Sequence, residues 1–207
     1  MLANSQAPGA RILEVGCGTG TGSEIIAQTV MSKQGSPILV MSDFSGEMMR
    51  LAKRRLEESD YSLIPGNKLE VDTETDFIDG GIKKDLDAMV AGHGDGFRKL
   101  VYGCRASGSA LPFPDSWFTC YVSNLVLQLI DSPENQIREA YRVLKPGSIA
   151  AFTVWGRKDY SLLFTTQAEA ARRKRAAAGE DAGEPFPPEP EGSTSCFTVG
   201  QNISKYL

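Results

Sequence analysis

The chain has 207 residues, of which 41% are hydrophobic and 23% charged, the proportions of an ordinary folded domain. Its net charge of -4 gives no general attraction for nucleic acid, so we expect no nucleic-acid partner. No apolar run reaches the length of a membrane span, and the four cysteines form no CxxC pair, so we expect neither a membrane helix nor a metal site. Unpaired cysteines and a start without a basic, apolar leader predict a cytoplasmic location.

The first part of the chain alternates short apolar runs with helical patterns. Residues 10–16 (ARILEVG) predict a buried strand, and residues 19–35 predict a helix. Residues 36–43 (SPILVMSD) form a nearly continuous apolar run, which is typical of a strand in a parallel sheet. A second helix is predicted over residues 45–59, with apolar side chains along one face.

Residues from about 60 to 98 interrupt this rhythm, because they are rich in Asp and Gly. We interpret them as an insertion that holds a small hairpin and a short helix. Residues 99–106 (KLVYGCRA) then resume as a strand. We also expect an acidic, proline-rich linker over about 180–195 and a single domain over 1–207.

The rest of the chain continues the alternation of strands and helices. After a loop, residues 118–130 begin as a strand, and Ser132 and Pro133 suit the start of the next helix. Residues 148–156 (SIAAFTVWG) predict the fifth strand, and residues 160–179 predict a helix. Such alternation predicts an α/β fold, Rossmann-like and doubly wound, with helices on both faces of a mostly parallel sheet.

The most informative segment is the glycine-rich stretch after the first strand. Gly16, Gly18 and Gly20 allow a tight turn and a close approach of a ligand to the main chain, although a plain turn is the alternative. Glu14 lies inside an apolar strand, where a carboxylate is costly without a partner, and Asp43 ends the second strand, where an acid can bind a ribose diol. The G-x-G-x-G spacing differs from the dinucleotide fingerprint G-x-G-x-x-G, which disfavours an NAD-dependent oxidoreductase.

Four segments, in order, resemble the class I S-adenosylmethionine-dependent methyltransferases, in particular the type 11 or ubiquinone/menaquinone methyltransferase-like group. They are LEVGCGTG (13–20), MSDFSGEMMRLAKRRL (41–56), ALPFPDSWFTCYVSNLVLQLI (110–130) and EAYRVLKPGSIAAFTVWG (139–156). The resemblance covers about three quarters of the chain, and SNLVLQ is also similar to the malonyl carrier-protein methyltransferases. It implies S-adenosyl-L-methionine as cofactor and S-adenosyl-L-homocysteine as product.

The resemblance also implies which residues contact the cofactor. Glu14 would help to orient its ammonium group, Asp43 would bind the ribose hydroxyls, and Phe44 would pack near the adenine. The family often has an acid near the adenine amine where this chain has Ser107, which brings no charge. The full expected set is Glu14, Gly16, Cys17, Gly18, Thr19, Gly20, Asp43, Phe44, Met48, Ser107, Gly108, Ser123, Asn124 and Leu125. Met48 is equally well explained as a core residue, and Cys17 is better explained by packing than as a nucleophile.

Methyl transfer from a sulfonium is an in-line displacement with a neutral leaving group, so alignment and exclusion of water are the main requirements. We therefore name no catalytic residue. The resemblance to the ubiquinone, menaquinone and sterol methyltransferases implies a small-molecule acceptor. The NPPY or DPPY sequence typical of planar amino acceptors is absent after the fourth strand, which argues against adenine-N6 or glutamine as the acceptor. Residues 60–98 and the helix after Gly156 are the expected acceptor lid.

The last two strands of the family's sheet are apparently missing from this sequence. Residues 148–156 would then be a long, apolar sheet edge without a guarding lysine or proline, and such an edge should be covered. A homodimer or a protein partner could supply the cover. The alternative function is therefore a catalytically inactive methyltransferase-like subunit that binds a partner through this edge.

Overall fold

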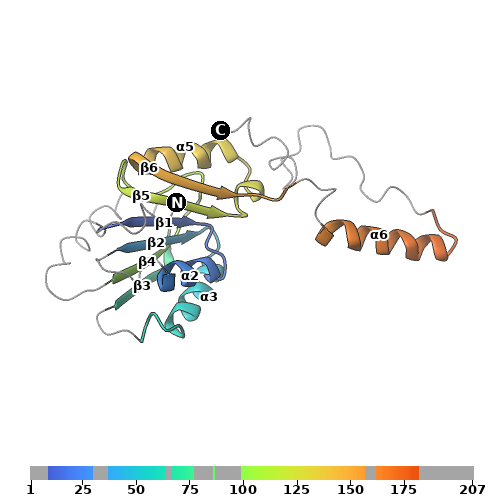
Figure 1. The fold of residues 1–207 in the computed structure, drawn as a ribbon, viewed down its shortest axis with the longest axis horizontal. Helices are drawn as coiled ribbons and strands as arrows, with labels where there is room; N and C mark the ends of the chain where they lie inside the picture. The colour runs from blue at the N-terminus through green and yellow to red at the C-terminus, as the bar shows by residue number, and fades with distance from the viewer. Residues whose placement is uncertain are drawn as a thin grey trace.

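The structure is a computed structural model of the chain, and it describes residues 9–29, 37–63, 67–76, 86, 99–156 and 162–181. A six-stranded sheet with the order β3-β4-β2-β1-β5-β6 forms its centre (Figure 1). Every neighbouring pair of strands is parallel, which confirms the predicted α/β class. The strands are β1 (Arg11–Val15), β2 (Ile38–Asp43), β3 (Asn67–Asp76), β4 (Lys99–Arg105), β5 (Phe118–Asn124) and β6 (Leu144–Thr153).

Helices cover both faces of this sheet. α2 (Thr21–Thr29) and α3 (Gly46–Glu57) pack on one face, and α5 (Pro133–Val143) packs on the other. The short 3-10 helix η1 (Leu127–Leu129) follows β5. The predicted helix over 160–179 is present as α6 (Leu162–Ala177), which lies to one side of the sheet in Figure 1.

Alternate residues of each central strand feed two separate cores. Leu13 and Val40 point to the α5 side, while Ile12 and Leu39 point to the α2 and α3 side. All four are almost completely buried. The continuous apolar runs that predicted a parallel sheet are therefore explained by burial on both faces.

The segment from 60 to 98 differs from its prediction. Its residues 67–76 form β3, which lies beside β4 and runs parallel to it, rather than forming an arm of a hairpin. The sheet thus has six described strands instead of the expected five. Leu86 is helical and fully buried in the core on the α5 side. The other residues of 77–98, and the linker beyond Asp181, lie outside the described residues.

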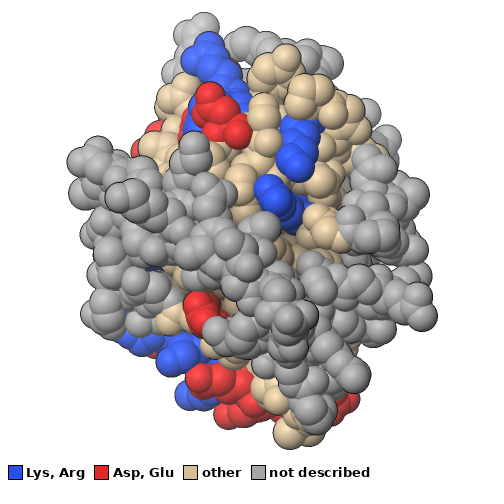
Figure 2. All heavy atoms as spheres, turned by 90° about the vertical axis from the view of Figure 1, so that its left-hand side faces the viewer, with Lys and Arg blue, Asp and Glu red and all other residues tan. Residues whose placement is uncertain are grey.

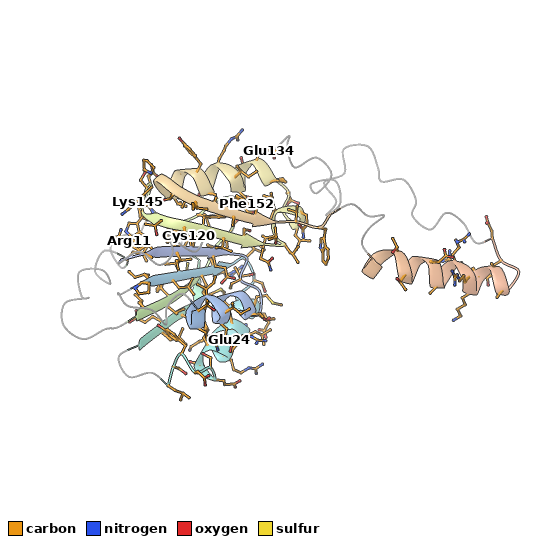
Figure 3. The ribbon with its side chains drawn as sticks, viewed as in Figure 1. Arg11, Glu24, Cys120, Glu134, Lys145 and Phe152 are labelled. Atoms are coloured by element: carbon orange, nitrogen blue, oxygen red, sulfur yellow. The ribbon has the colours of Figure 1, made fainter. Side chains whose placement is uncertain are left out.

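An edge strand is present, but it begins at Leu144, four residues earlier than predicted. It therefore contains Lys145 and Pro146, and the prediction of an edge without a guarding lysine or proline is wrong. β6 pairs with β5 and ends the described sheet, and none of its residues is fully buried. Arg11 and Lys145 mark the amino ends of β1 and β6, whereas Phe152 lies toward the carboxyl end (Figure 3). Figure 2 views the molecule from the amino-end side, where basic and acidic side chains of the described residues are interspersed. Within the described residues, no helix is both long and apolar enough to cross a membrane.

The loop before β5 is fastened to α5 by one arginine. Arg142 donates to the carbonyl oxygens of Leu111 and Phe113 at 2.9 and 2.7 Å, and to the carboxylate of Asp115 at 2.7 Å. It also forms an ion pair with Glu139, whose carboxylate accepts a bond from the Leu111 N–H at 2.6 Å. This network joins residues 111–115 (LPFPD) to the last turns of α5.

We expect Arg142→Lys to lower the free energy of unfolding by about 1–2 kcal/mol, because an ammonium cannot reproduce the guanidinium fork. Chemical denaturation would measure the change. The matched control is Arg138→Lys on the same helix, since Arg138 bonds to Asn135 alone in the described structure, and it should change stability by less than about 0.5 kcal/mol. Equal effects of the two substitutions would contradict the assignment.

Candidate functional site

A cleft of about 690 Å³ opens at the carboxyl edge of the sheet. Its walls come from the loops after β1, β2, β4 and β5, which is where parallel α/β sheets bind their ligands. The lining residues are Val15, Gly16, Gly18, Asp43, Phe44, Ala106, Ser107, Gly108, Ser109, Asn124, Leu125, Val126, Leu129, Ile130, Asp131 and Ser132. This set includes eight of the residues expected from the sequence.

The glycine turn is held by the end of β2. The backbone N–H groups of Gly16 and Cys17 both donate to the carbonyl oxygen of Ser42, at 2.8 and 3.0 Å. Gly16, Gly18 and Gly20 have φ values of 73°, 54° and 80°, all in the left-handed region that favours glycine. The backbone conformation of the turn therefore requires glycine at these positions, whether or not a ligand is bound.

The space around each glycine shows which of them are required by packing within the protein and which leaves room for a ligand. A Cβ on Gly16 would lie 2.2 Å from a methyl carbon of Val126, and a Cβ on Gly20 would lie 2.8 Å from the Cα of Ala52 in α3. A Cβ on Gly22 would lie 2.3 Å from the carboxylate of Glu14. Only at Gly18, among the glycines of this turn, would a Cβ meet nothing within 4 Å. Gly16 and Gly18 both line the cleft, but only Gly18 has open space at its Cβ position.

Asp43 joins the turn to the cleft. Its Oδ2 accepts a hydrogen bond from the Gly18 N–H at 2.9 Å, and its Oδ1 accepts one from the Ser45 N–H at 2.8 Å. A carboxylate offers about four acceptor positions, so both oxygens keep capacity for the hydroxyl groups of a ligand. The neighbouring Phe44 ring is 71% exposed, and the Arg105 guanidinium lies 5.8 Å from its centre and donates to its carbonyl oxygen.

Glu14 lies beneath the turn rather than in the cleft wall. It is 3% exposed and accepts a hydrogen bond from the Ser23 hydroxyl at 2.5 Å. Burial raises the pKa of this carboxyl to about 7, against the lowering effect of the Ser23 hydrogen bond, and Asp43 adds to the rise. Glu14 therefore connects β1 to the first turn of α2.

The other expected residues that lie outside the cleft wall include two that are buried and contact other side chains of the protein. Cys17 is buried with its Sγ 3.7 Å from the Met49 sulfur, and burial raises the pKa of its thiol far above the usual range. Ser123 is also buried, and its hydroxyl accepts a hydrogen bond from Gln136. Thr19, Gly20 and Met48 do not line the cleft either. Contacts of Glu14 and of these residues with a cofactor stay predictions.

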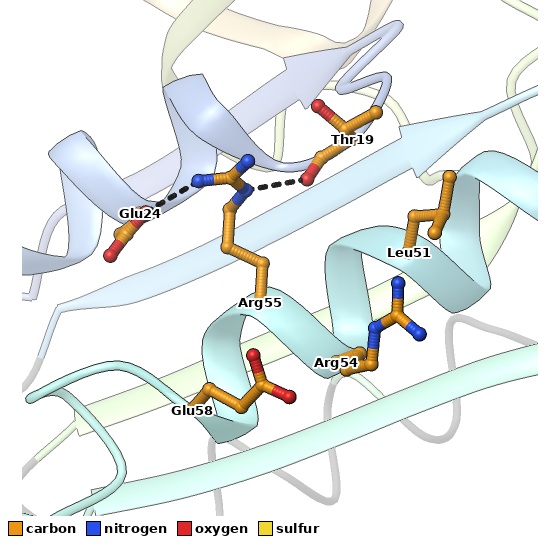
Figure 4. A pocket seen from close by; sticks show the side chains of 6 residues that line it. All are labelled: Thr19, Glu24, Leu51, Arg54, Arg55 and Glu58. Atoms are coloured by element: carbon orange, nitrogen blue, oxygen red, sulfur yellow. Dashed lines mark hydrogen bonds and ion pairs between the residues drawn. The ribbon is translucent and has the colours of Figure 1, made fainter.

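A second pocket of about 440 Å³ lies behind the turn, between α2 and α3 (Figure 4). Arg55 reaches across it and donates to the Thr19 carbonyl oxygen at 3.0 Å and to the Glu24 carboxylate at 3.2 Å. These bonds tie α3 to the outer side of the glycine turn. Thr19 thus belongs to the support of the turn.

The sequence analysis missed the wall formed by Leu129, Ile130, Asp131 and Ser132. These residues connect η1 to α5, and they reach the cleft because Pro133 starts α5 close to the carboxyl edge of the sheet. The available signal was the predicted helix start at Ser132 and Pro133, since it places the preceding residues at that edge. Within the described residues, no cluster of three or more His, Cys, Asp or Glu could hold a metal ion.

Comparisons with known proteins find similarity to methyltransferases. Residues 85–152 match the family described as a methyltransferase domain, and residues 2–83 match the protein-L-isoaspartate(D-aspartate) O-methyltransferase family. The ubiquinone/menaquinone biosynthesis C-methyltransferase UbiE of Photorhabdus laumondii is 33% identical over 90 residues, which are 42% of this chain and 33% of that protein. UbiE of Vibrio cholerae is 24% identical over 140 residues, 68% of this chain and 39% of that protein.

A solved structure supports the fold. A crystal structure of a SAM-dependent methyltransferase from Methanosarcina mazei superposes with a TM-score of 0.50, at 19% identity, covering 91% of this chain and 70% of that one. The chain spans about a third to two fifths of the length of the two UbiE proteins.

The parallel sheet, the glycine turn and the cleft define an α/β domain of the Rossmann-like, cofactor-binding class. The family matches narrow this class further. Two methyltransferase family models match successive parts of the chain, residues 2–83 and 85–152, so the resemblance to the class I S-adenosylmethionine-dependent methyltransferases is confirmed, and it implies S-adenosyl-L-methionine as the cofactor. The observed cleft fits that group, because it offers an open backbone at Gly18 and a carboxylate with free acceptor capacity at Asp43.

We expect Gly18→Ala to weaken binding of S-adenosylhomocysteine by about tenfold or more, because the added methyl group would occupy open space at a residue that lines the cleft. Titration calorimetry would measure the affinity. Gly147→Ala is the matched control, since Gly147 also has a positive φ, of 80°, and open space around its Cβ position, but it lies outside the cleft. Both variants should lose about 1–2 kcal/mol of stability, and only the first should lose affinity. Similar affinities for both would show that the Gly18 backbone does not face the cofactor.

Glu14 should make the stability of the cofactor-free protein fall as pH rises. Its pKa is about 7 when folded and 4.5 ordinarily, so the folded state holds an extra proton between these values. The free energy of unfolding then decreases with pH through this window. Glu14→Gln keeps an acceptor for the Ser23 hydroxyl and cannot ionise. The difference in the free energy of unfolding between this variant and the wild type should therefore shift in favour of the variant by up to about 3 kcal/mol from pH 5 to pH 8. Parallel stability profiles from denaturant titrations would refute the raised pKa.

Proposed function

We propose that the chain binds S-adenosylmethionine in the 690 Å³ cleft and directs its methyl group to a small-molecule acceptor. The observation that carries the proposal is the meeting of Gly18 and Asp43 at the cleft wall. The open Gly18 backbone allows close approach, and Asp43 presents a carboxylate that is fixed by two backbone N–H groups. Pre-oriented groups of this kind bind without reorganising.

When bound, the cofactor supplies an activated methyl group. The protein's own part is to align the acceptor and to keep water out. Asp43 would accept hydrogen bonds from the ribose hydroxyls, and Phe44 and Ser107 would border the adenine. Asn124 and Leu125, at the end of β5, would lie along the methionine part.

The acceptor would lie against the apolar part of the cleft wall. Val126, Leu129 and Ile130 form this part, and Leu129 is 72% exposed. A small, largely apolar acceptor fits these walls, and the similarity to UbiE supports carbon methylation of a ring compound as the first reaction to test.

The test is calorimetric titration with S-adenosylhomocysteine of the wild type and of Asp43→Asn. Loss of a hydrogen-bonded charge should weaken binding by roughly 10- to 100-fold. The control is Ser45→Ala, which removes the α3 cap bond from Met48 N–H to Ser45 Oγ but keeps the carboxylate, so affinity should stay within about twofold. An unchanged Asp43→Asn affinity would contradict the placement of the ribose.

A second candidate function rests on the exposed β6 edge. The chain would then act as a methyltransferase-like subunit that binds a protein partner there, without catalysis. A wild-type chain that is folded but does not bind S-adenosylhomocysteine would favour this function. Binding followed by methyl transfer to a panel of phenolic and quinol acceptors would favour the enzyme.

A further inference from the structure

Leu125 adopts a backbone conformation that leucine rarely accepts. Its φ is 58°, in the left-handed region, and it lines the cleft directly after β5. The Cβ of an L-residue is crowded in this region, and leucine has no polar group with which to stabilise itself there. Such a residue stays in place only when its surroundings hold it, and such positions cluster at functional sites.

Three hydrogen bonds hold the Leu125 backbone. Its N–H donates to both the carbonyl oxygen and the hydroxyl oxygen of Thr153 in β6, each at 3.0 Å. Its carbonyl oxygen accepts a bond from Nε2 of Gln128 in η1 at 2.9 Å. The Thr153 hydroxyl in turn donates to Oδ1 of Asn124 at 2.5 Å. Both polar groups of the Leu125 main chain are therefore fixed by residues of other elements.

Gln128 places a polar side chain at a buried position, which is energetically unfavourable. Its side chain is 2% exposed, and its Oε1 is buried without a partner in the described part of the structure. A buried amide with one unsatisfied atom is unfavourable, and an apolar side chain of similar size would avoid this cost. The bond that Gln128 does make goes to the strained Leu125.

Leu125 also influences the glycine turn through its neighbour Val126. Val126, the next residue, has a methyl carbon 2.2 Å from where a Cβ on Gly16 would lie, so it packs directly against the bare backbone of Gly16. A rotation of the Leu125 backbone would move Val126 against, or away from, this turn. The conformation of Leu125 therefore affects how Val126 packs against the glycine turn.

We propose that Gln128 is a positioning residue for cofactor binding, acting through the backbone of Leu125. It touches no cleft surface itself, but it holds Leu125 in the left-handed conformation in which Asn124, Leu125 and Val126 form one wall of the cleft. The inference rests on the proposed function to the extent that the cofactor occupies this cleft.

The test is a double-mutant cycle with S-adenosylhomocysteine as the probe. Gln128→Met keeps the size of the side chain and removes the hydrogen bond, so affinity should fall about threefold to tenfold. Leu125→Gly relieves the strain, because glycine adopts a positive φ freely. In the Leu125→Gly background, adding Gln128→Met should change affinity by less than about twofold. The effect of Gln128→Met on affinity would then depend on Leu125, which is the coupling that the proposal requires.

Stability is measured alongside affinity by chemical denaturation. Val143→Ala is the control for a purely structural effect, since Val143 is fully buried in α5, at the end of the helix away from the cleft, and its truncation should destabilise the fold without changing affinity. An unchanged affinity in Gln128→Met, or an equal loss in both Leu125 backgrounds, would overturn the inference. A folded wild type that does not bind S-adenosylhomocysteine would overturn the proposed function as well.

Discussion

The functional edge of this domain depends on hydrogen bonds that the end of β2 accepts from the glycine turn. Two successive N–H groups, those of Gly16 and Cys17, converge on the Ser42 carbonyl oxygen, and the Gly18 N–H meets the Asp43 carboxylate. A turn in the left-handed region has no internal partners for these groups, so a neighbouring strand must supply them. The parallel pairing of β1 and β2 does so by bringing the two strand ends level. The residue that can bind a ligand is therefore also a residue that shapes the turn.

The glycines of the turn, like Asp43, have roles within the protein as well as toward a ligand. Within the G-x-G-x-G pattern, close contacts with Val126 and Ala52 require Gly16 and Gly20, and Gly18 leaves open space; Gly22, which follows the pattern, lies against Glu14. Two of the three glycines of the pattern are therefore explained by the packing of α3 and the β5 loop around the turn, although Gly16 also lines the cleft. Glu14 fits the same account, because its buried carboxylate connects β1 to Ser23 in α2.

Much of the fold could be predicted because the central strands are buried on both faces, and their apolar runs carry that information locally. β3 was harder, since NKLEVDTETD is polar and lies at an edge, and whether it pairs in parallel depends on chain that is distant in sequence. Within the site, the sequence located the turn and the strand ends but could not say which side of the turn faces the cleft. It therefore grouped Cys17 and Met48 with Gly18, although Cys17 packs against Met49. The wall at Asp131 escaped notice because a loop position depends on where α5 begins relative to the sheet.

The opposite wall of the cleft depends on the edge strand. Thr153, the last residue of β6, bonds both to the Leu125 N–H and to the Asn124 side chain. β6 is held in the described sheet by β5 on one side, so its position is less constrained than that of a central strand. A displacement of β6 along or away from β5 would move Thr153 and release the strained Leu125. The β6 edge and the cleft are thus linked through Thr153, Asn124 and Leu125, and the two candidate functions of the chain would depend on the same residues.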